Sequence, residues 1–158
     1  MANAKALRIC KTDLEYSRAA TKLGDQPGFS PIKRKAAMST IEVTKDNFSQ
    51  ITKEGIVILD FWAPWCGPCR QFGPIFEKVS DAHEDITFGK VNTDEQQELG
   101  ATFEIMSIPT VMIFRDGIQV YQQPGALAKP ALEELLEKAR NLDMDDIRAK
   151  VAEQQAAQ

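Results

Sequence analysis

The most informative segment of this 158-residue chain reads Asp60-Phe61-Trp62-Ala63-Pro64-Trp65-Cys66-Gly67-Pro68-Cys69-Arg70. It continues an apolar run that begins at Ile56 and is rich in β-branched and aromatic residues. A continuous run of this length predicts a central strand that is covered on both faces. After the tight connection at 63–69, apolar residues recur at helical spacing from Gln71 to Ala82. The two cysteines are therefore expected where a buried strand passes into a helix.

The rest of the chain continues this alternation of strands and helices. Strands are expected at 40–43, 86–91, 110–114 and 118–122, and helices at 45–51, 94–102 and 130–140. The Asp-Gly pair at 116–117 predicts a hairpin between the last two strands. The order β-α-β-α-β-α-β-β-α predicts an α/β fold in which a mixed sheet lies between helices. A further stretch, 145–157, is expected to be helical but mostly polar.

Composition and charge exclude several classes of protein. The chain has 43% hydrophobic and 27% charged residues, as globular domains do, and is about one domain long. No apolar run approaches the roughly 18 to 20 residues that cross a bilayer, and the N-terminus lacks the continuous apolar stretch of roughly 7 to 15 residues that is typical of a secretory signal. Residues 1–37 carry a net charge of +5, and the remaining residues carry −9. We therefore expect a soluble, cytoplasmic protein whose acidic body binds neither nucleic acid nor membranes. We also expect a monomer.

We expect three regions: a basic extension at 1–37, a domain at 38–141 and a short helical extension at 142–158. Residues 1–37 show no sustained period and end in a segment rich in glycine and proline, which is typical of a disordered tail. Two other interpretations are an organelle transit peptide and sequence upstream of a true start at Met38. Cys10 in this extension is either incidental or a regulatory partner that forms an intermolecular disulfide.

A Cys-x-x-Cys sequence that opens a helix favours redox chemistry. The first sulfur lies beside free backbone N–H groups and the positive end of the helix dipole, which stabilise a thiolate. Cys66 is thus the expected nucleophile, and Cys69, less exposed, the thiol that resolves a mixed disulfide. Three alternatives are a metal site, a structural disulfide and two unreactive core cysteines. Zinc normally needs four ligands, and only Cys10 and His83 remain available, so no metal is expected.

Residues 60–70 resemble the active-site segment of the thioredoxin family, which usually reads D-F-W-A-x-W-C-G-P-C-K/R. The resemblance covers about residues 40–141 and continues through Pro74, Lys90-Val91-Asn92, Asp94, Ile108-Pro109-Thr110, Phe114, Gly117 and Gly125-Ala126. It implies the thioredoxin fold, a five-stranded mixed β-sheet flanked by four helices. The chain departs modestly from the family pattern at Pro64 and Pro124.

The resemblance also implies how a target is held. Pro109 is expected to follow a cis peptide bond that brings the backbone of Ile108–Thr110 beside the cysteines, where it pairs with an extended target strand. An ordinary proline at a strand start is the alternative. The other expected target-binding residues surround the cysteines: Trp65, Gly67, Pro68, Thr110, Gly125 and Ala126. The Gly67-Pro68 spacer lacks the histidine of oxidising relatives, which favours a reductant.

Asp60 is the exceptional acid, because a carboxyl group within an apolar central strand is costly unless it is neutral, paired or functional. The resemblance implies a position beneath Cys69. We expect Asp60, assisted by Lys90, to relay a proton to or from the Cys69 thiol. The alternative is a buried ion pair without a catalytic role.

Together these features predict a protein-disulfide reductase that works through a reversible Cys66–Cys69 couple. The resemblance implies that no cofactor is bound and that electrons come from NADPH through the flavin of thioredoxin reductase. The expected partners are that reductase and disulfide-containing target proteins, and the expected role is cell redox homeostasis. Two other hypotheses are an exported oxidant or isomerase and a non-catalytic binding module that uses the same groove.

Overall fold

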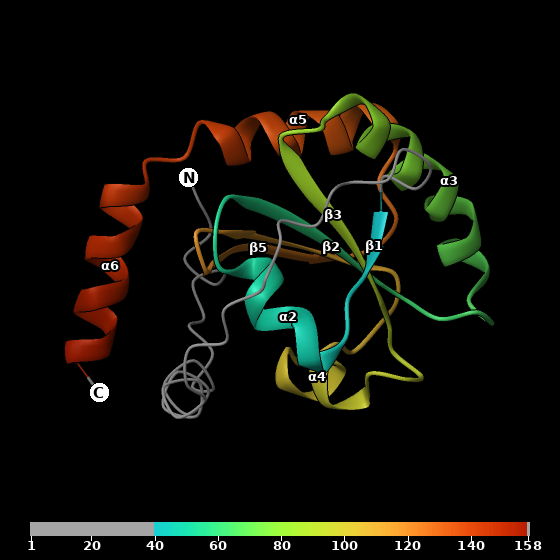
Figure 1. Cartoon of the computed structure of the whole chain (residues 1–158), viewed down its shortest axis with the longest axis horizontal. Helices are drawn as coiled ribbons and strands as arrows, with labels where there is room; N and C mark the ends of the chain where they lie inside the picture. Colours follow the sequence, from blue (N-terminus) through green and yellow to red (C-terminus); the bar gives the residue numbers. More distant parts are fainter. Residues whose placement is uncertain (1–39, 158) are drawn as a thin grey trace, which may run out of the picture.

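The computed structural model describes residues 40–157, so the predictions for residues 1–37, Cys10 and a start at Met38 lie outside the described residues. Five strands form one sheet in the order β1-β3-β2-β4-β5 (Figure 1). β1, β3 and β2 run parallel, β4 is antiparallel to β2, and β5 is antiparallel to β4. The predicted mixed sheet is confirmed. The strands are β1 (Thr40–Glu42), β2 (Ile56–Trp62), β3 (Ile86–Asn92), β4 (Thr110–Arg115) and β5 (Ile118–Pro124).

Helices follow the strands in the predicted order. They are α2 (Lys45–Thr52), α3 (Gly67–Ala82), α4 (Gln97–Thr102), α5 (Lys129–Arg140) and α6 (Met144–Ala156). α3 begins earlier than the apolar spacing predicted, because Cys66 acts as its N-cap and Pro68 suits the first turn. α4 begins later than predicted, because the side-chain and backbone oxygens of Asn92 accept the N–H groups of residues 94–96 in a turn.

The two faces of the sheet carry separate hydrophobic cores, because side chains along a buried strand alternate between its faces. On one face, Ile58 and Phe88 pack with residues of α3 and α5, such as Phe76 and Leu136. On the other face, Leu59 and Phe61 pack with residues of α2 and α4, such as Phe48 and Leu99. Figure 1 shows α3 with α5 on one side of the sheet and α2 with α4 on the other. β2 is therefore covered on both faces, as its apolar run predicted.

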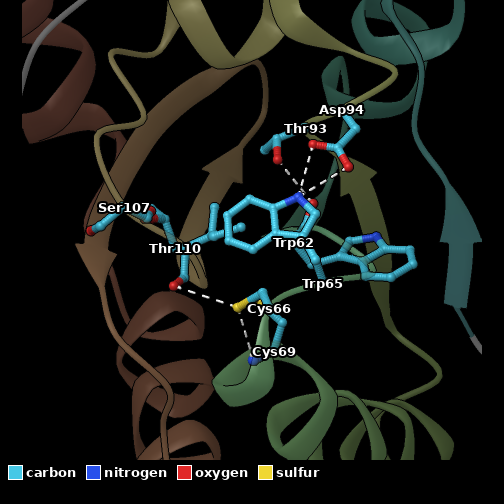
Figure 2. Close-up of a disulfide and its surroundings, with 9 residues drawn as sticks. Trp62, Trp65, Cys66, Cys69, Thr93, Asp94, Ser107 and Thr110 are labelled. Atoms are coloured by element: carbon cyan, nitrogen blue, oxygen red, sulfur yellow. Dashed lines mark hydrogen bonds between the residues drawn. A yellow bond between two sulfur atoms is a disulfide. The ribbon is translucent and has the colours of Figure 1, made fainter.

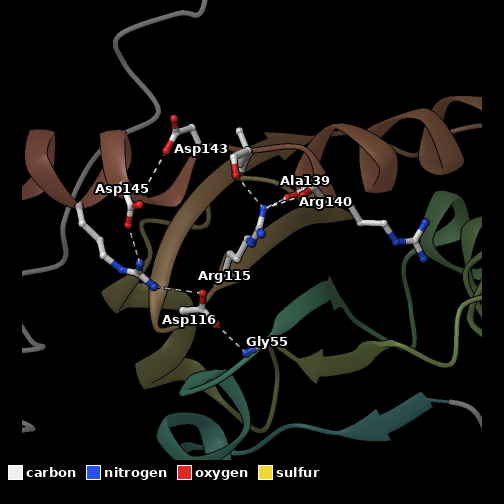
Figure 3. Close-up of polar contacts among 9 residues, drawn as sticks. Gly55, Arg115, Asp116, Ala139, Arg140, Asp143 and Asp145 are labelled. Atoms are coloured by element: carbon white, nitrogen blue, oxygen red, sulfur yellow. Dashed lines mark hydrogen bonds and ion pairs between the residues drawn. The ribbon is translucent and has the colours of Figure 1, made fainter.

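α6 lies to one side of these layers, and the turn between β4 and β5 ties it to them (Figures 1 and 3). Nη1 of Arg115 donates to the carbonyl oxygens of Ala139, Arg140 and Leu142 at 2.7, 2.9 and 3.0 Å. These carbonyls belong to the end of α5 and the connection to α6, where backbone acceptors lack helical partners. Asp116 forms an ion pair with Arg148 of α6 at 3.3 Å. No helix within residues 40–157 has both the length and the apolar character needed to cross a membrane.

Candidate active site

The redox pair lies at the carboxyl end of β2, where the chain turns into α3. Cys66 and Cys69 form a disulfide whose Cα atoms are 5.3 Å apart (Figure 2). The backbone N–H of Cys69 donates to Sγ of Cys66 at 3.2 Å, so the sulfur of Cys66 caps the helix. A charged thiolate accepts such a bond better than a neutral thiol does, and the positive end of the 16-residue helix adds to the effect. The geometry therefore favours Cys66 as the thiolate.

Exposure does not distinguish the two cysteines. Their exposed fractions are 4% for Cys66 and 3% for Cys69, so both are buried and Cys69 is only marginally the less exposed one, in the expected direction. What distinguishes them is polar contact: Sγ of Cys66 accepts the helical N–H and also lies 3.7 Å from the carbonyl oxygen of Ile108. In the reduced protein, a Cys66 thiol is in reach to donate to that carbonyl.

The loop before β4 faces the disulfide. Its Ile108–Pro109 peptide bond is cis, and Pro109 is buried. The hydroxyl of Thr110, itself 2% exposed, donates to the carbonyl oxygen of Ser107 at 2.6 Å and closes the loop. This bond ties the backbone of residues 107–110 in place beside Cys66.

A third segment joins this loop from the end of β5. The backbone N–H of Gly125 donates to the carbonyl oxygen of Pro109 at 2.8 Å. Gly125 has φ of +109°, a conformation that side-chain-bearing residues rarely adopt. Gly125 and Ala126 are both exposed. The structure thus brings together residues 65–69, 107–110 and 125–126 from three separate parts of the chain.

The two tryptophans differ in their surroundings. Trp65 is 69% exposed, and its indole N–H donates to both carboxylate oxygens of Asp94, at 3.1 and 3.2 Å. Trp62 is half-buried, and Nζ of Lys90 lies 5.0 Å from the centroid of its ring. Trp65 is thus available for contact with a target, whereas Trp62 packs beside the cysteines and its ring lies under Nζ of Lys90. Pro68 is exposed and Gly67 half-exposed beside the disulfide.

Asp94 and Glu77 are contacts that sequence reasoning missed. Asp94 was part of the matched motif without an expected role, and it orients the exposed indole of Trp65. Glu77 on α3 accepts from Nζ of Lys90 at 3.3 Å. The available signal was positional: Asp94 follows β3 at the edge where Trp65 follows β2, and the carboxyl ends of parallel strands meet at one edge.

Asp60 is fully buried in the centre of β2, opposite Lys90 on β3 and Val111 on β4. Neither of its carboxylate oxygens has a hydrogen-bond partner within residues 40–157. Burial raises the pKa of Asp60 to about 7, and the positive charge of Lys90 lowers it in part. The carboxyl group therefore exchanges its proton near neutral pH, which is the property that a general acid or base needs.

Comparisons with known proteins agree with this geometry. The thioredoxin family model matches residues 39–138. A protein of Streptomyces coelicolor described as a putative thioredoxin 2 is 55% identical over 119 residues, which cover 75% of this chain and 89% of that relative. The thioredoxin of Bacillus subtilis is 40% identical over 102 residues, which cover 64% of this chain and 98% of that relative.

A solved structure supports the same assignment. The crystal structure of the Malassezia sympodialis thioredoxin superposes with a TM-score of 0.59 at 35% sequence identity, and covers 65% of this chain and 91% of that one. The fold of this chain is thus similar to that of a solved thioredoxin, and its own redox pair lies where β2 passes into α3. Their agreement with the sequence match shows that the chain belongs to the thioredoxin family and is a protein-disulfide oxidoreductase.

Proposed function

We propose that this protein reduces disulfide bonds in other proteins and is itself reduced again by an NADPH-dependent thioredoxin reductase. The observation that carries the proposal is the Cys66–Cys69 pair at the start of α3, with Sγ of Cys66 beside the carbonyl of Ile108. The reduced pair supplies two electrons. The loop with the cis proline places backbone groups that can pair with a target next to the reacting sulfur. Both requirements of the reaction meet at one edge of the sheet.

The reaction takes place in two exchange steps. The thiolate of Cys66 attacks one sulfur of the target disulfide, which forms a mixed disulfide and releases the other target sulfur as a thiolate that takes up a proton. The thiolate of Cys69 then attacks Sγ of Cys66, which breaks the mixed disulfide and releases the second target sulfur. The target gains two electrons and two protons, and the protein becomes the disulfide form.

Asp60 is the residue that we assign to the proton of Cys69, with Lys90 as the residue that adjusts its pKa. A carboxyl group with a pKa of about 7 holds or releases a proton at neutral pH at little cost. Its full burial in β2 keeps bulk solvent away. In the ionised form it accepts the proton of the Cys69 thiol, directly or through one water molecule, as that thiol becomes the attacking thiolate.

A target segment lies across the three segments of the site in this proposal. An extended chain pairs with the backbone of Ile108–Thr110 and packs on Trp65 at one end and on Gly125 and Ala126 at the other. Gly67 and Pro68 leave space above the sulfur of Cys66. Because the exposed indole of Trp65 is flat and apolar, it accepts many different targets.

No cofactor is bound to this protein in the proposed cycle. The electrons of NADPH pass through the flavin of the reductase and reach the Cys66–Cys69 disulfide by thiol–disulfide exchange. The proposed location is the cytoplasm, and the proposed role is to keep cytoplasmic thiols reduced. Two bacterial relatives, described as a putative thioredoxin and a thioredoxin, at 55% and 40% identity, support the proposed role.

The test is to follow NADPH consumption by a thioredoxin reductase with insulin as the disulfide substrate. The wild-type protein is expected to turn over many times, whereas Cys69→Ser stops after forming a mixed disulfide at Cys66. Cys66→Ser is the matched control and is expected to form no mixed disulfide. If the reductase fails while dithiothreitol still drives insulin reduction, the electron donor is wrong. Failure with both donors contradicts the reductase assignment and favours the hypothesis of a non-catalytic binding module.

A further inference from the structure

Lys90 stands beside one acidic residue in the sheet but pairs with another on α3. Asp60 and Lys90 are register partners on the adjacent strands β2 and β3. Ile58 and Phe88 stand two residues earlier on these strands, and both pack in the core with α3 and α5. Because side chains two apart along a strand share a face, Asp60 and Lys90 face this same side of the sheet. Nevertheless, Nζ of Lys90 lies 3.3 Å from Oε1 of Glu77, and neither carboxylate oxygen of Asp60 has a hydrogen-bond partner within residues 40–157.

The ammonium group of Lys90 lies between α3 and the indole of Trp62. Its Nζ is 5.0 Å from the centroid of the Trp62 ring. A Cβ atom added at Gly73 would lie 3.7 Å from the same Nζ, so the ammonium group approaches the helix where this residue has no side chain. Gly73 and Glu77 are four residues apart on α3 and therefore share one face of the helix. One turn of α3 thus supplies both the space and the negative charge that receive Lys90.

The other elements around Asp60 present mostly apolar groups to it. Its neighbour on β4 is Val111, and α5 contributes apolar residues to the core on this face, namely Leu132, Leu136 and Ala139. Tyr121 of β5 packs against the same core, and burial raises the pKa of its hydroxyl, so it is neutral at neutral pH. Within residues 40–157, the charge that acts on Asp60 is that of Lys90, which lowers the pKa of Asp60 against the larger effect of burial. The position of Lys90 therefore governs the electrostatics of this acid.

The flexible four-carbon stem of Lys90 gives its ammonium group a choice between the two acids. An opposite charge within about 4 to 6 Å of a carboxyl group lowers its pKa by roughly one to three units. While Lys90 pairs with Glu77, burial keeps the pKa of Asp60 at about 7. An ammonium group directly against Asp60 would instead leave this acid ionised at neutral pH, where it could accept a proton but not return one.

We propose that Glu77 is a positioning residue that holds the ammonium group of Lys90 away from Asp60, so that Asp60 can both take up and release a proton. The inference rests on the proposed function, in which Asp60 exchanges a proton with the thiol of Cys69 on α3. The side chain of Glu77 is 56% exposed and acts on the site through its pair with Lys90. Glu77 thus adds a residue of α3 to the pair on β2 and β3.

The direct test follows the titration of Asp60 by NMR in the full chain. The protein is kept in the disulfide form, so that neither cysteine titrates, and the ¹³C shift of the Asp60 carboxyl carbon is recorded from pH 4 to 10. In the wild-type protein the midpoint is expected near 7. Glu77→Gln keeps the size of the side chain but removes its charge. In this variant the midpoint is expected to fall by roughly one unit, the lower end of the range for an opposite charge that comes close.

A double-mutant cycle separates positioning from the charge of Glu77 itself, whose removal alone would also lower the midpoint. The substitution is therefore repeated in the Lys90→Met protein, or in Lys90→Gln if amide spectra show that Lys90→Met is not folded. If Glu77 acts through Lys90, Glu77→Gln is expected to leave the midpoint of this protein unchanged. Glu95→Gln is the control for net charge, because it removes one charge from an exposed residue that follows β3, and is expected to leave the wild-type midpoint in place.

The kinetic readout is the pH inflection in the decay of a mixed disulfide between Cys66 and glutathione. In Glu77→Gln it is expected to move to lower pH by the same amount as the NMR midpoint, which a merely structural role would not produce.

Two NMR results overturn the inference. A midpoint that stays in place or rises in Glu77→Gln shows that Lys90 does not move to Asp60. A fall of equal size in the Lys90→Met protein shows that Glu77 acts by its own charge and not by positioning. Neither result depends on reduction of a target, so the reductase function stands in both cases. A wild-type protein that reduces no target, whatever the NMR midpoints, contradicts the proposed function instead.

Discussion

Asp60 and Lys90 face each other as register partners on the parallel strands β2 and β3, yet Lys90 forms its ion pair with Glu77 of α3. Lys90 is thereby held over the ring of Trp62 and not against the carboxyl group. It lowers the pKa of Asp60 through its charge but does not offset the larger effect of burial, which leaves that pKa at about 7. Asp60 and Lys90 therefore form no direct salt bridge within residues 40–157, and we propose that Asp60 serves as the proton site for Cys69.

Asp60→Asn is expected to stabilise the oxidised protein at alkaline pH. The folded-state pKa of about 7 exceeds the ordinary value of 3.8, so the unfolded state ionises first as pH rises. Asp60 therefore lowers the free energy of unfolding progressively as pH rises from about 4 to 7 and keeps it lowered above pH 7, by roughly 4 kcal/mol in total at 1.36 kcal/mol for each pKa unit. The gain from Asn is thus expected to be largest above pH 7 and small near pH 4.

Urea unfolding of wild type and Asp60→Asn at pH 4, 5, 6, 7 and 8 measures this difference. Subtracting the two curves removes the contributions of carboxylates common to both proteins, such as Asp85, whose pKa is lowered by Arg140. A difference that stays constant or shrinks as pH rises through this range would contradict the raised pKa.

The same substitution is expected to slow the second exchange step and leave the first nearly unchanged. A mixed disulfide of Cys66 with glutathione resolves faster in the wild-type protein as pH rises through about 7, because ionised Asp60 can then accept the proton of Cys69. Asp60→Asn loses this inflection, while iodoacetamide alkylation of Cys66 in the reduced protein stays close to the wild-type rate.

Lys90→Met tests whether the charge of Lys90 sets the pKa of Asp60. Removing the positive charge takes away the contribution that lowers the pKa of Asp60, so the inflection in the resolution rate is expected to move to higher pH. The readout is the decay of the glutathione mixed disulfide between pH 6 and 9. An inflection that stays in place or moves to lower pH would show that Lys90 does not act on Asp60.

Gly89→Ala is expected to destabilise the protein by about 1 to 3 kcal/mol, the range for overpacked cores. A Cβ atom at this position of β3 would lie 2.5 Å from Cγ2 of Val43 and 2.7 Å from Cδ2 of Leu59. Gly100→Ala is the matched change within α4, where nothing lies within 4 Å of the added atom. There alanine is expected to stabilise by roughly 0.5 to 1 kcal/mol through its helix propensity. Urea unfolding at pH 7 measures both, and equal effects would contradict the packing argument.

Arg115→Met is expected to cost about 1 to 3 kcal/mol, because three carbonyl oxygens at the junction of α5 and α6 lose a charged donor while the apolar stem is kept (Figure 3). Arg148→Ala is the control on the same face. Arg148 is half-exposed, and its ion pairs within residues 40–157 are surface pairs with Asp116 and Asp145, so its loss is expected to stay within about 0.5 kcal/mol. Thermal unfolding of the two variants side by side makes the comparison.

The sequence predicted the order of strands and helices because each element carries its own periodic pattern. The apolar run at 56–62 is recognisable as a buried strand without knowledge of its neighbours. The starts of α3 and α4 were less predictable, since a cap at Cys66 and a turn at Asn92 set them and neither follows from apolar spacing. The likeness to a known family added the expectation of a cis bond before Pro109, which local periodicity does not encode.

The amino-acid sequence by itself determined which residues carry the chemistry: a cysteine pair one helical turn apart, a carboxyl group within an apolar strand and a tryptophan beside the first sulfur. Only the tertiary structure decided which residues lie next to these groups, because the sheet order β1-β3-β2-β4-β5 joins segments that are far apart in the chain. It bonds Asp94 to Trp65, directs Lys90 to Glu77 and brings the carbonyl oxygen of Ile108 next to Sγ of Cys66. Side-chain contacts of this kind depend on packing between elements, which no local pattern specifies.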